Sequence, residues 1–96
     1  MHVIFGDRAL ADLREIWEFL AEGSEDVADR VVLQLIERAE SVGDFPLAAT
    51  FVPELAEQRI RRVMLRDWAM LYEVRQTYID VHRIVSGRKD LASLTW

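Results

Sequence analysis

Two segments with the apolar spacing of helices meet at Gly23-Ser24, and this short joint is the feature that most constrains the fold. Before the joint, apolar residues recur three and four residues apart, at Leu10, Leu13, Trp17 and Leu20, with Ile16 beside them. After it, the same spacing continues through Val27, Val31, Leu35, Ala39 and Val42. A joint of one or two residues folds two helices back on each other, so the sequence predicts a helical hairpin. We expect Leu10, Leu13 and Trp17 to lie in its core.

The ends of both segments carry typical helix boundaries. A short apolar strand is predicted over residues 2–5, and Asp7 stands where an N-cap belongs. Ser24 is the predicted cap of the second helix, followed by Glu25 and Asp26, whose charges suit a helix N-terminus. The second helix is expected to end at Gly43.

The second half of the chain has a different pattern. Residues 44–53 include two helix-breaking prolines, Pro46 and Pro53, and are predicted to form an ordered crossing loop. Residues 59–66, 68–75 and 78–86 are strand-length runs with very short joints, which antiparallel neighbours require. The predicted fold class is therefore α+β: an N-terminal strand, then a helical hairpin packed on one face of an antiparallel sheet (β-α-α-β-β-β). Residues 1–96 are expected to form a single domain, whose other sheet face meets solvent or a partner.

Charge is divided unequally along the chain. Residues 1–58 hold 13 acidic and 4 basic residues, a net charge of −9, whereas residues 59–96 hold 4 acidic and 8 basic residues, a net charge of +4. The overall charge of −5 argues against direct binding of DNA. The arginines of the second half are suited to paired contacts with phosphate or carboxylate groups.

The composition excludes several kinds of site. The chain has no cysteine and only two histidines, and its four glycines each stand alone at an element boundary, so we expect no metal, no cofactor and no phosphate-cradling loop. His82 and Ser86 are too far apart along one strand for nucleophilic catalysis. No apolar stretch is long enough to span a membrane, which predicts a cytoplasmic protein without a membrane partner.

The remaining candidates are basic residues of the strands and of the segment after them. Arg61 and Arg62 alternate on the second predicted strand, Arg83 lies on the last, and Arg88 and Lys89 follow it. Because side chains alternate between the two faces of a strand, Arg83 is expected to share a face with Val81 and Val85. Arg83 and Arg75 have a structural alternative, pairing with a carboxylate such as Glu73. For Arg88 and Lys89 the alternative is an ion pair with Asp90.

Five segments in this order resemble the RelE/ParE superfamily of bacterial type II toxins. They are Ala11-Asp12-Leu13-Arg14-Glu15-Ile16-Trp17, Val52-Pro53-Glu54-Leu55, Ile60-Arg61, Met70-Leu71-Tyr72 and Ile84-Val85-Ser86-Gly87-Arg88-Lys89-Asp90-Leu91. The resemblance covers nearly the whole chain. It implies a toxin, of the kind also called plasmid stabilisation proteins, that is neutralised by a small antitoxin with a DNA-binding N-terminus and a flexible C-terminus. It also implies one of two targets: DNA gyrase for ParE-like members, or messenger RNA in the ribosome for RelE-like members.

Departures from the family pattern favour the ParE-like activity. Ala69 replaces a usual arginine, Ser86 replaces a frequent histidine, and Met64 stands where RelE-like nucleases carry a lysine. No aromatic acid or base follows the basic pair unless Trp96 marks its place. Metal-independent RNA cleavage needs a base and an acid besides cations, and arginine supplies only a cation.

We therefore expect a gyrase inhibitor without catalysis of its own, in which Arg61, Arg83, Arg88 and Lys89 contact the target or the antitoxin. If the chain is instead a RelE-like mRNA endonuclease, Arg61, Arg62, Arg88 and Lys89 would hold the scissile phosphate. A third possibility is a degenerate toxin that only binds its antitoxin.

Overall fold

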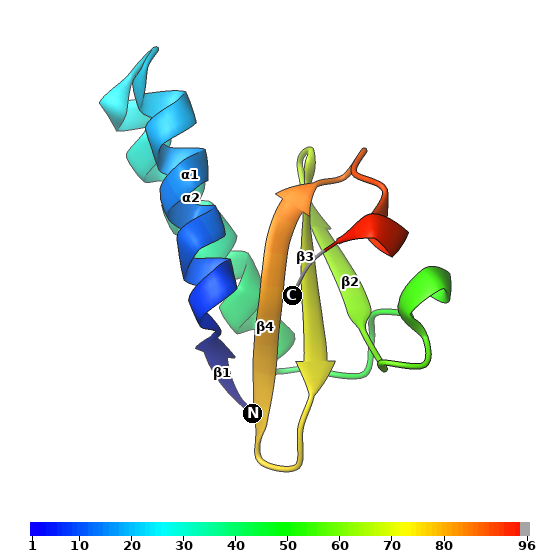
Figure 1. Cartoon of the computed structure of the whole chain (residues 1–96). Coiled ribbons are helices and arrows are strands. Elements are labelled where there is room, and N and C mark those ends of the chain that lie inside the picture. Colours follow the sequence, from blue (N-terminus) through cyan, green and yellow to red (C-terminus); the bar gives the residue numbers. More distant parts are fainter. Residues whose placement is uncertain (95–96) are drawn as a thin grey trace.

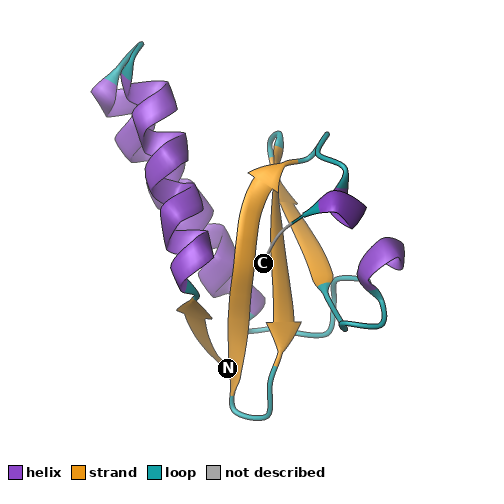
Figure 2. Ribbon diagram, viewed as in Figure 1, coloured by secondary structure: helices purple, strands orange, loops and turns teal. Residues whose placement is uncertain are grey.

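The computed structural model describes residues 1–94, which form a helical hairpin on one side of a four-stranded sheet (Figure 1, Figure 2). In chain order the elements are β1 (His2–Phe5), α1 (Asp7–Ala21), α2 (Glu25–Val42), the short 3-10 helix η1 (Pro53–Leu55), β2 (Arg61–Leu65), β3 (Trp68–Val74), β4 (Tyr78–Ser86) and the 3-10 helix η2 (Leu91–Ser93). The predicted α+β class and order of elements are confirmed. Among residues 1–94, no helix is long and apolar enough to cross a membrane.

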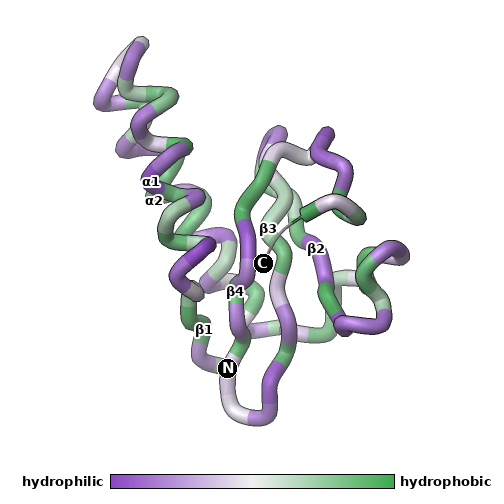
Figure 3. The backbone as a smooth tube through the Cα atoms, viewed as in Figure 1, coloured by the Kyte–Doolittle hydropathy of each residue, from purple (hydrophilic) through white to green (hydrophobic). Residues whose placement is uncertain are grey.

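The hairpin turns at Gly23 and Ser24, as predicted. The Oγ of Ser24 accepts a hydrogen bond of 3.2 Å from the backbone N–H of Val27 and so caps α2. At α1 the cap is Gly6 rather than Asp7, which is the first helical residue. Figure 3 shows hydrophobic and hydrophilic residues alternating along both helices, so each helix has one face to bury.

The buried face of α1 differs from the predicted one. Its buried residues are Ala9, Asp12, Leu13 and Ile16. Leu10 is half exposed, so its placement in the core was wrong. Trp17 is only partly buried, and its indole N–H donates a hydrogen bond of 2.8 Å to Asp29 of α2. The helices are therefore joined by a polar contact as well as by apolar packing.

The sheet has the order β1-β4-β3-β2. The meander of β2, β3 and β4 is antiparallel, as predicted, but β1 runs parallel to β4, so the sheet is mixed rather than wholly antiparallel. β1 pairs only with residues 78–81, the first part of β4. The remainder of β4 therefore has no strand on that side.

β2 is shorter than the predicted strand over residues 59–66. Arg59 and Arg66 adopt φ angles of 61° and 52°, in the left-handed region that an extended strand does not use. The strand is thus confined to Arg61–Leu65. Arg66 and Asp67 form the two-residue turn that joins Leu65 to its partner Trp68.

A β-bulge in β4 changes which side chains share a face. Leu71 pairs with Arg83 but Tyr72 pairs with Val81, which leaves His82 as an extra residue in β4. Val81 consequently packs in the core beneath the helices, whereas Val85 packs on the opposite face. The predicted common face for these valines was wrong because a bulge shifts the period-two alternation.

The face of the sheet away from the helices is not left open, contrary to prediction. A second apolar cluster covers part of it, formed by Val52, Leu55, Ile60, Ala69, Leu71, Val85, Leu91 and Leu94. These residues come from the sheet, from η1 and η2, and from their flanks (Figure 1). The two short 3-10 helices and their flanks thus close a small second core on this face.

Asp12 accepts hydrogen bonds from the part of β4 that has no neighbouring strand on the side of β1. The Oδ2 of Asp12 accepts hydrogen bonds of 2.8 Å from both the Arg83 Nε and the backbone N–H of Ile84, and its Oδ1 accepts one of 3.0 Å from the Arg83 Nη2. The side chains of Asp12 and Arg83 are only 8% and 10% exposed. The hydrogen bond to Asp12 is the main reason that the pKa of Arg83 is raised. This contact joins α1 to β4 where β1 has ended.

Gly43, at the end of α2, lies against the start of the chain. Its carbonyl accepts a hydrogen bond of 2.8 Å from the amino group of Met1. A Cβ at this position would collide with the backbone carbonyl oxygen of Met1. A side chain is therefore excluded by the close approach of two backbone segments.

Asp12→Ala should lower the free energy of unfolding by about 3–5 kcal/mol, because it leaves a buried guanidinium and a backbone N–H unpaired. Urea denaturation monitored by circular dichroism measures this. Glu37→Ala, an exposed position on α2, is the control and should stay within about 0.5 kcal/mol of wild type. A loss below about 1 kcal/mol for Asp12→Ala would show that the contact does not hold α1 on the sheet.

Gly43→Ala should destabilise the fold by about 1–3 kcal/mol, since one of the two backbone segments must move. Gly23→Ala is the matched control, because a Cβ there meets only ordinary van der Waals contact. Equal unfolding midpoints for the two variants in the same denaturant titration would contradict the close approach at Gly43.

Candidate functional site

Arg61 and Arg62 point to different surroundings from the start of β2. Arg61 is partly buried, donates a hydrogen bond to the carbonyl of Ala49 and lies over the ring of Phe51, with 4.2 Å from its Cζ to the ring centroid. This contact fixes the loop before η1 against the strand. Arg62 is exposed. Alternation along the strand thus gives one arginine a structural contact and leaves the other at the surface.

Arg62 lies on the rim of a groove beside β2. The groove has a volume of about 540 Å³ and runs between the C-terminal part of α2, residues 45–50 and the outer edge of β2. Arg38 of α2 faces it from the other side. Its Nη1 donates to the Oγ of Ser41 (3.2 Å) and its Nε approaches the carbonyl of Met64 (3.4 Å). The groove thus brings together two arginines from separate elements.

Arg83 is the most constrained of the predicted site residues. Pairing with a carboxylate was one of its two predicted roles, but the partner is Asp12 of α1 rather than Glu73. Because the guanidinium is buried and held in a bidentate contact, it presents little surface to a partner.

Arg88 and Lys89 are exposed in the turn that follows β4. The backbone N–H of Arg88 donates to the Oγ of Ser86, which orders the turn. Asp90 instead caps η2, where its carboxylate accepts from the backbone N–H of Ala92 (3.1 Å). Within residues 1–94 there is no ion pair for Arg88 or Lys89. Lys89 borders a cavity of about 300 Å³ between α1 and the end of β4.

The four residues expected to hold a scissile phosphate do not converge. Arg61 pairs with Tyr72, whereas Ser86, two residues before Arg88, pairs with Trp68 at the other end of β3. Four residues of strand separate these positions, or roughly 13 Å. Arg62 and Lys89 moreover border different cavities. The basic residues therefore form two separate groups, one at each end of the sheet.

Two residues of the family pattern are buried and unavailable to a substrate. Ala69 is 1% exposed within the second apolar cluster. Tyr72 is also 1% exposed, and its hydroxyl donates a hydrogen bond to the carbonyl of Pro46 (3.1 Å). Burial raises the pKa of Tyr72, whereas the charges of Arg61 and Arg38 act to lower it. Tyr72 is thus held neutral as a structural residue. Trp96 lies outside the described residues.

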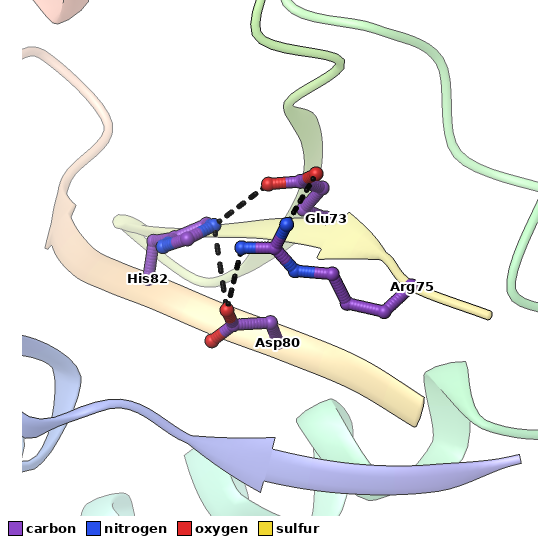
Figure 4. A network of polar contacts seen from close by, with 4 residues as sticks. All are labelled: Glu73, Arg75, Asp80 and His82. Carbon is purple, nitrogen blue, oxygen red and sulfur yellow. Dashed lines mark hydrogen bonds and ion pairs between the residues drawn. The ribbon is translucent and has the colours of Figure 1, made fainter. Parts of the chain in front are cut away.

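A polar network on the sheet surface accounts for His82 and Arg75 (Figure 4). Arg75 bridges Glu73 (3.1 Å) and Asp80 (3.2 Å), as the predicted carboxylate pairing requires. The hydrogen bond to Asp80 is the main reason that the pKa of Arg75 is raised. The Nε2 of His82 lies 3.2 Å from Glu73 and 3.8 Å from Asp80. Within residues 1–94, no group of three or more His, Asp or Glu side chains is arranged to hold a metal ion.

Two important residues were missed by reasoning from the sequence. Asp12 had a detectable pattern, because it is an acid that shares a helical face with Ala9, Leu13 and Ile16. Arg38 had none, since an arginine on a helix is ordinarily solvent-exposed. Its relation to Arg62 depends on how α2 is placed beside β2.

Comparisons with known proteins agree with this fold. The model of the family described as the ParE toxin of the type II toxin-antitoxin system parDE matches residues 3–91. Among solved structures, the chromosomal ParDE TA system from P. aeruginosa is similar, with 19% sequence identity, a TM-score of 0.73 and coverage of 90% of this chain and 95% of that chain. No curated protein sequence matches the chain. Because the family model spans most of the sequence and the fold agrees with it, this chain belongs to the ParE toxin family of type II toxin-antitoxin systems.

Proposed function

We propose that this toxin is neutralised by a cognate antitoxin and inhibits DNA gyrase by binding it, without cutting nucleic acid itself. The main support is the separation of the basic residues. Arg61 and Arg62 lie at one end of the sheet and Arg88 and Lys89 at the other, so they do not surround one phosphate. A nuclease of this kind needs a base, an acid and cations around the same reacting atoms.

The exposed turn after β4 is the proposed contact surface for the target. Arg88 and Lys89 project from an ordered turn and form no ion pair with any residue in 1–94. Such cations make charge-assisted hydrogen bonds to carboxylates of a partner. Arg83 supports this surface indirectly, because its contact with Asp12 fixes the end of β4.

The charge of the molecule favours a protein target over the ribosome. The chain carries a net charge of −5, and binding to RNA gains most of its affinity from positive charge. A local pair of cations on an otherwise acidic protein is better suited to recognition of a protein surface.

Expression of the toxin without its antitoxin should arrest growth of a bacterial host, cause DNA double-strand breaks and leave transcripts intact. Purified toxin should inhibit supercoiling by gyrase in vitro. Codon-specific cleavage of messenger RNA in a translation reaction would instead identify a RelE-like nuclease. Unimpaired growth with retained antitoxin binding would identify a degenerate toxin.

The double variant Arg88→Ala/Lys89→Ala should weaken gyrase inhibition at least about tenfold, since each charge-assisted contact contributes about 1.5–3 kcal/mol. The matched control is Arg14→Ala/Arg30→Ala, which removes two exposed arginines from the helical hairpin. Supercoiling assays give the half-inhibitory concentrations, and thermal unfolding should be unchanged for both variants. Equal inhibition by the two double variants would exclude this turn as the target surface.

A further inference from the structure

Two turns of the chain are hydrogen-bonded to each other at one end of the sheet. The first turn, Arg66 and Asp67, joins β2 to β3, and the second begins at Gly87, directly after β4. The backbone N–H of Gly87 donates a hydrogen bond of 2.7 Å to the carbonyl of Asp67. Figure 1 shows both turns at the end of the sheet toward which β4 points. Because Arg66 precedes Asp67 and Arg88 follows Gly87, this bond brings two arginines from separate turns to the same place.

The close approach of the two turns depends on the small size of Gly87. A Cβ at this position would lie 2.8 Å from the Cε of Met64 and 3.2 Å from the carbonyl oxygen of Asp67. The end of a methionine side chain can turn away, but the carbonyl belongs to the backbone of the neighbouring turn. A side chain at residue 87 would therefore press the two turns apart.

Arg66 occupies a position where the backbone disfavours it. Its φ of 52° is left-handed, whereas that of Asp67 is not. Two-residue hairpin turns in which only the first residue has a positive φ prefer glycine at that position, because glycine has no Cβ. Strained backbone of this kind is found mainly at functional sites. The geometry of the turn therefore does not account for an arginine at residue 66.

The side chain of Arg66 adds a third cation to this end of the molecule. Arg66, Arg88 and Lys89 are all exposed, and none of them forms an ion pair within residues 1–94. The acidic residues of the same two turns are Asp67 and Asp90, and the carboxylate of Asp90 already caps η2. The cations of the two turns thus outnumber the carboxylates that could neutralise them.

From these observations we propose that Arg66 is part of the surface by which the toxin binds its target, and that this surface fits an acidic patch of a protein. The inference rests on the proposed function, in which the turn after β4 contacts gyrase. Guanidinium groups form paired, charge-assisted hydrogen bonds with carboxylates. Because the bond from Gly87 to Asp67 fixes the two turns before binding, less conformational entropy is lost when the three cations engage a partner.

A protein surface suits this site better than the backbone of a nucleic acid. Affinity for DNA depends on how many phosphates the protein neutralises, and only three cations are gathered here on a chain of net charge −5. Two short turns also cannot follow the regular repeat of phosphates along a duplex. A compact group of carboxylates on a folded protein matches the size of the site.

The role of Arg66 is tested with Arg66→Gly, which removes the charge and leaves a residue suited to left-handed backbone. The unfolding midpoint should stay the same or rise, whereas the half-inhibitory concentration for supercoiling by gyrase should rise about three- to tenfold. Arg59→Gly is the matched control, because Arg59 is also exposed and left-handed (φ 61°) but precedes the other end of β2. It should leave inhibition within about twofold of wild type. Equal inhibition by the two variants would overturn the inference.

Two further variants test the sign of the charge and the joining of the turns. Asp67→Asn removes a negative charge beside the cations, so it should strengthen inhibition about two- to threefold. Gly87→Ala changes no charge but presses on the carbonyl of Asp67, so it should weaken inhibition by a similar factor, unlike Gly23→Ala, whose Cβ has space. Weaker inhibition by Asp67→Asn would overturn an acidic partner, and equal inhibition by the two alanine variants would overturn the need for joined turns.

The class of partner is tested by measuring Kd for gyrase without DNA. Arg66→Gly should raise this Kd about three- to tenfold and reduce its dependence on salt. Binding that requires DNA, or equally tight binding to a duplex oligonucleotide alone, would overturn a protein surface as the partner. Failure of the wild-type toxin to bind or inhibit gyrase would instead overturn the proposed function. Inhibition by the wild type that is unaffected by Arg66→Gly would overturn only the present inference.

Discussion

The contact of Asp12 with Arg83 and with the backbone of Ile84 holds the two layers of this protein together. β1 pairs with only the first part of β4, so the rest of that edge would present unpaired backbone groups. One carboxylate from α1 satisfies the N–H of Ile84 and neutralises the buried guanidinium of Arg83 in the same place. A helix side chain thus does what a longer β1 would have done. The placement of the hairpin, and the cavity between α1 and β4, depend on it.

The arginines of the second half of the chain serve different purposes even though they are alike in sequence. Arg61 stacks on Phe51, Arg75 bridges two carboxylates, and Arg83 is buried against α1. These three stabilise the fold. Arg62, Arg88 and Lys89 are exposed at separate places, which is why the positive half of the sequence does not become one continuous positive surface. This separation supports a toxin that acts through contacts with other proteins.

The exposed basic residues lie on different parts of the sheet. Arg88 and Lys89 lie in the turn after β4, whereas Arg62 borders the groove beside β2. Because these places are separate, a substitution at one of them leaves the surroundings of the other unchanged.

Local pattern alone was sufficient for the order of the elements, because periodicity, capping at Ser24 and short joints are properties of neighbouring residues. The resemblance in motif order likewise indicated the ParE toxin family before the fold was known. Local pattern could not place β1 parallel to β4, because strand pairing across the hairpin is a long-range choice. The bulge at His82 reversed the inferred faces, and the left-handed conformations of Arg59 and Arg66 shortened β2. Only the tertiary structure decided which arginines are buried, because Asp12, the partner of Arg83, comes from a helix far away in sequence.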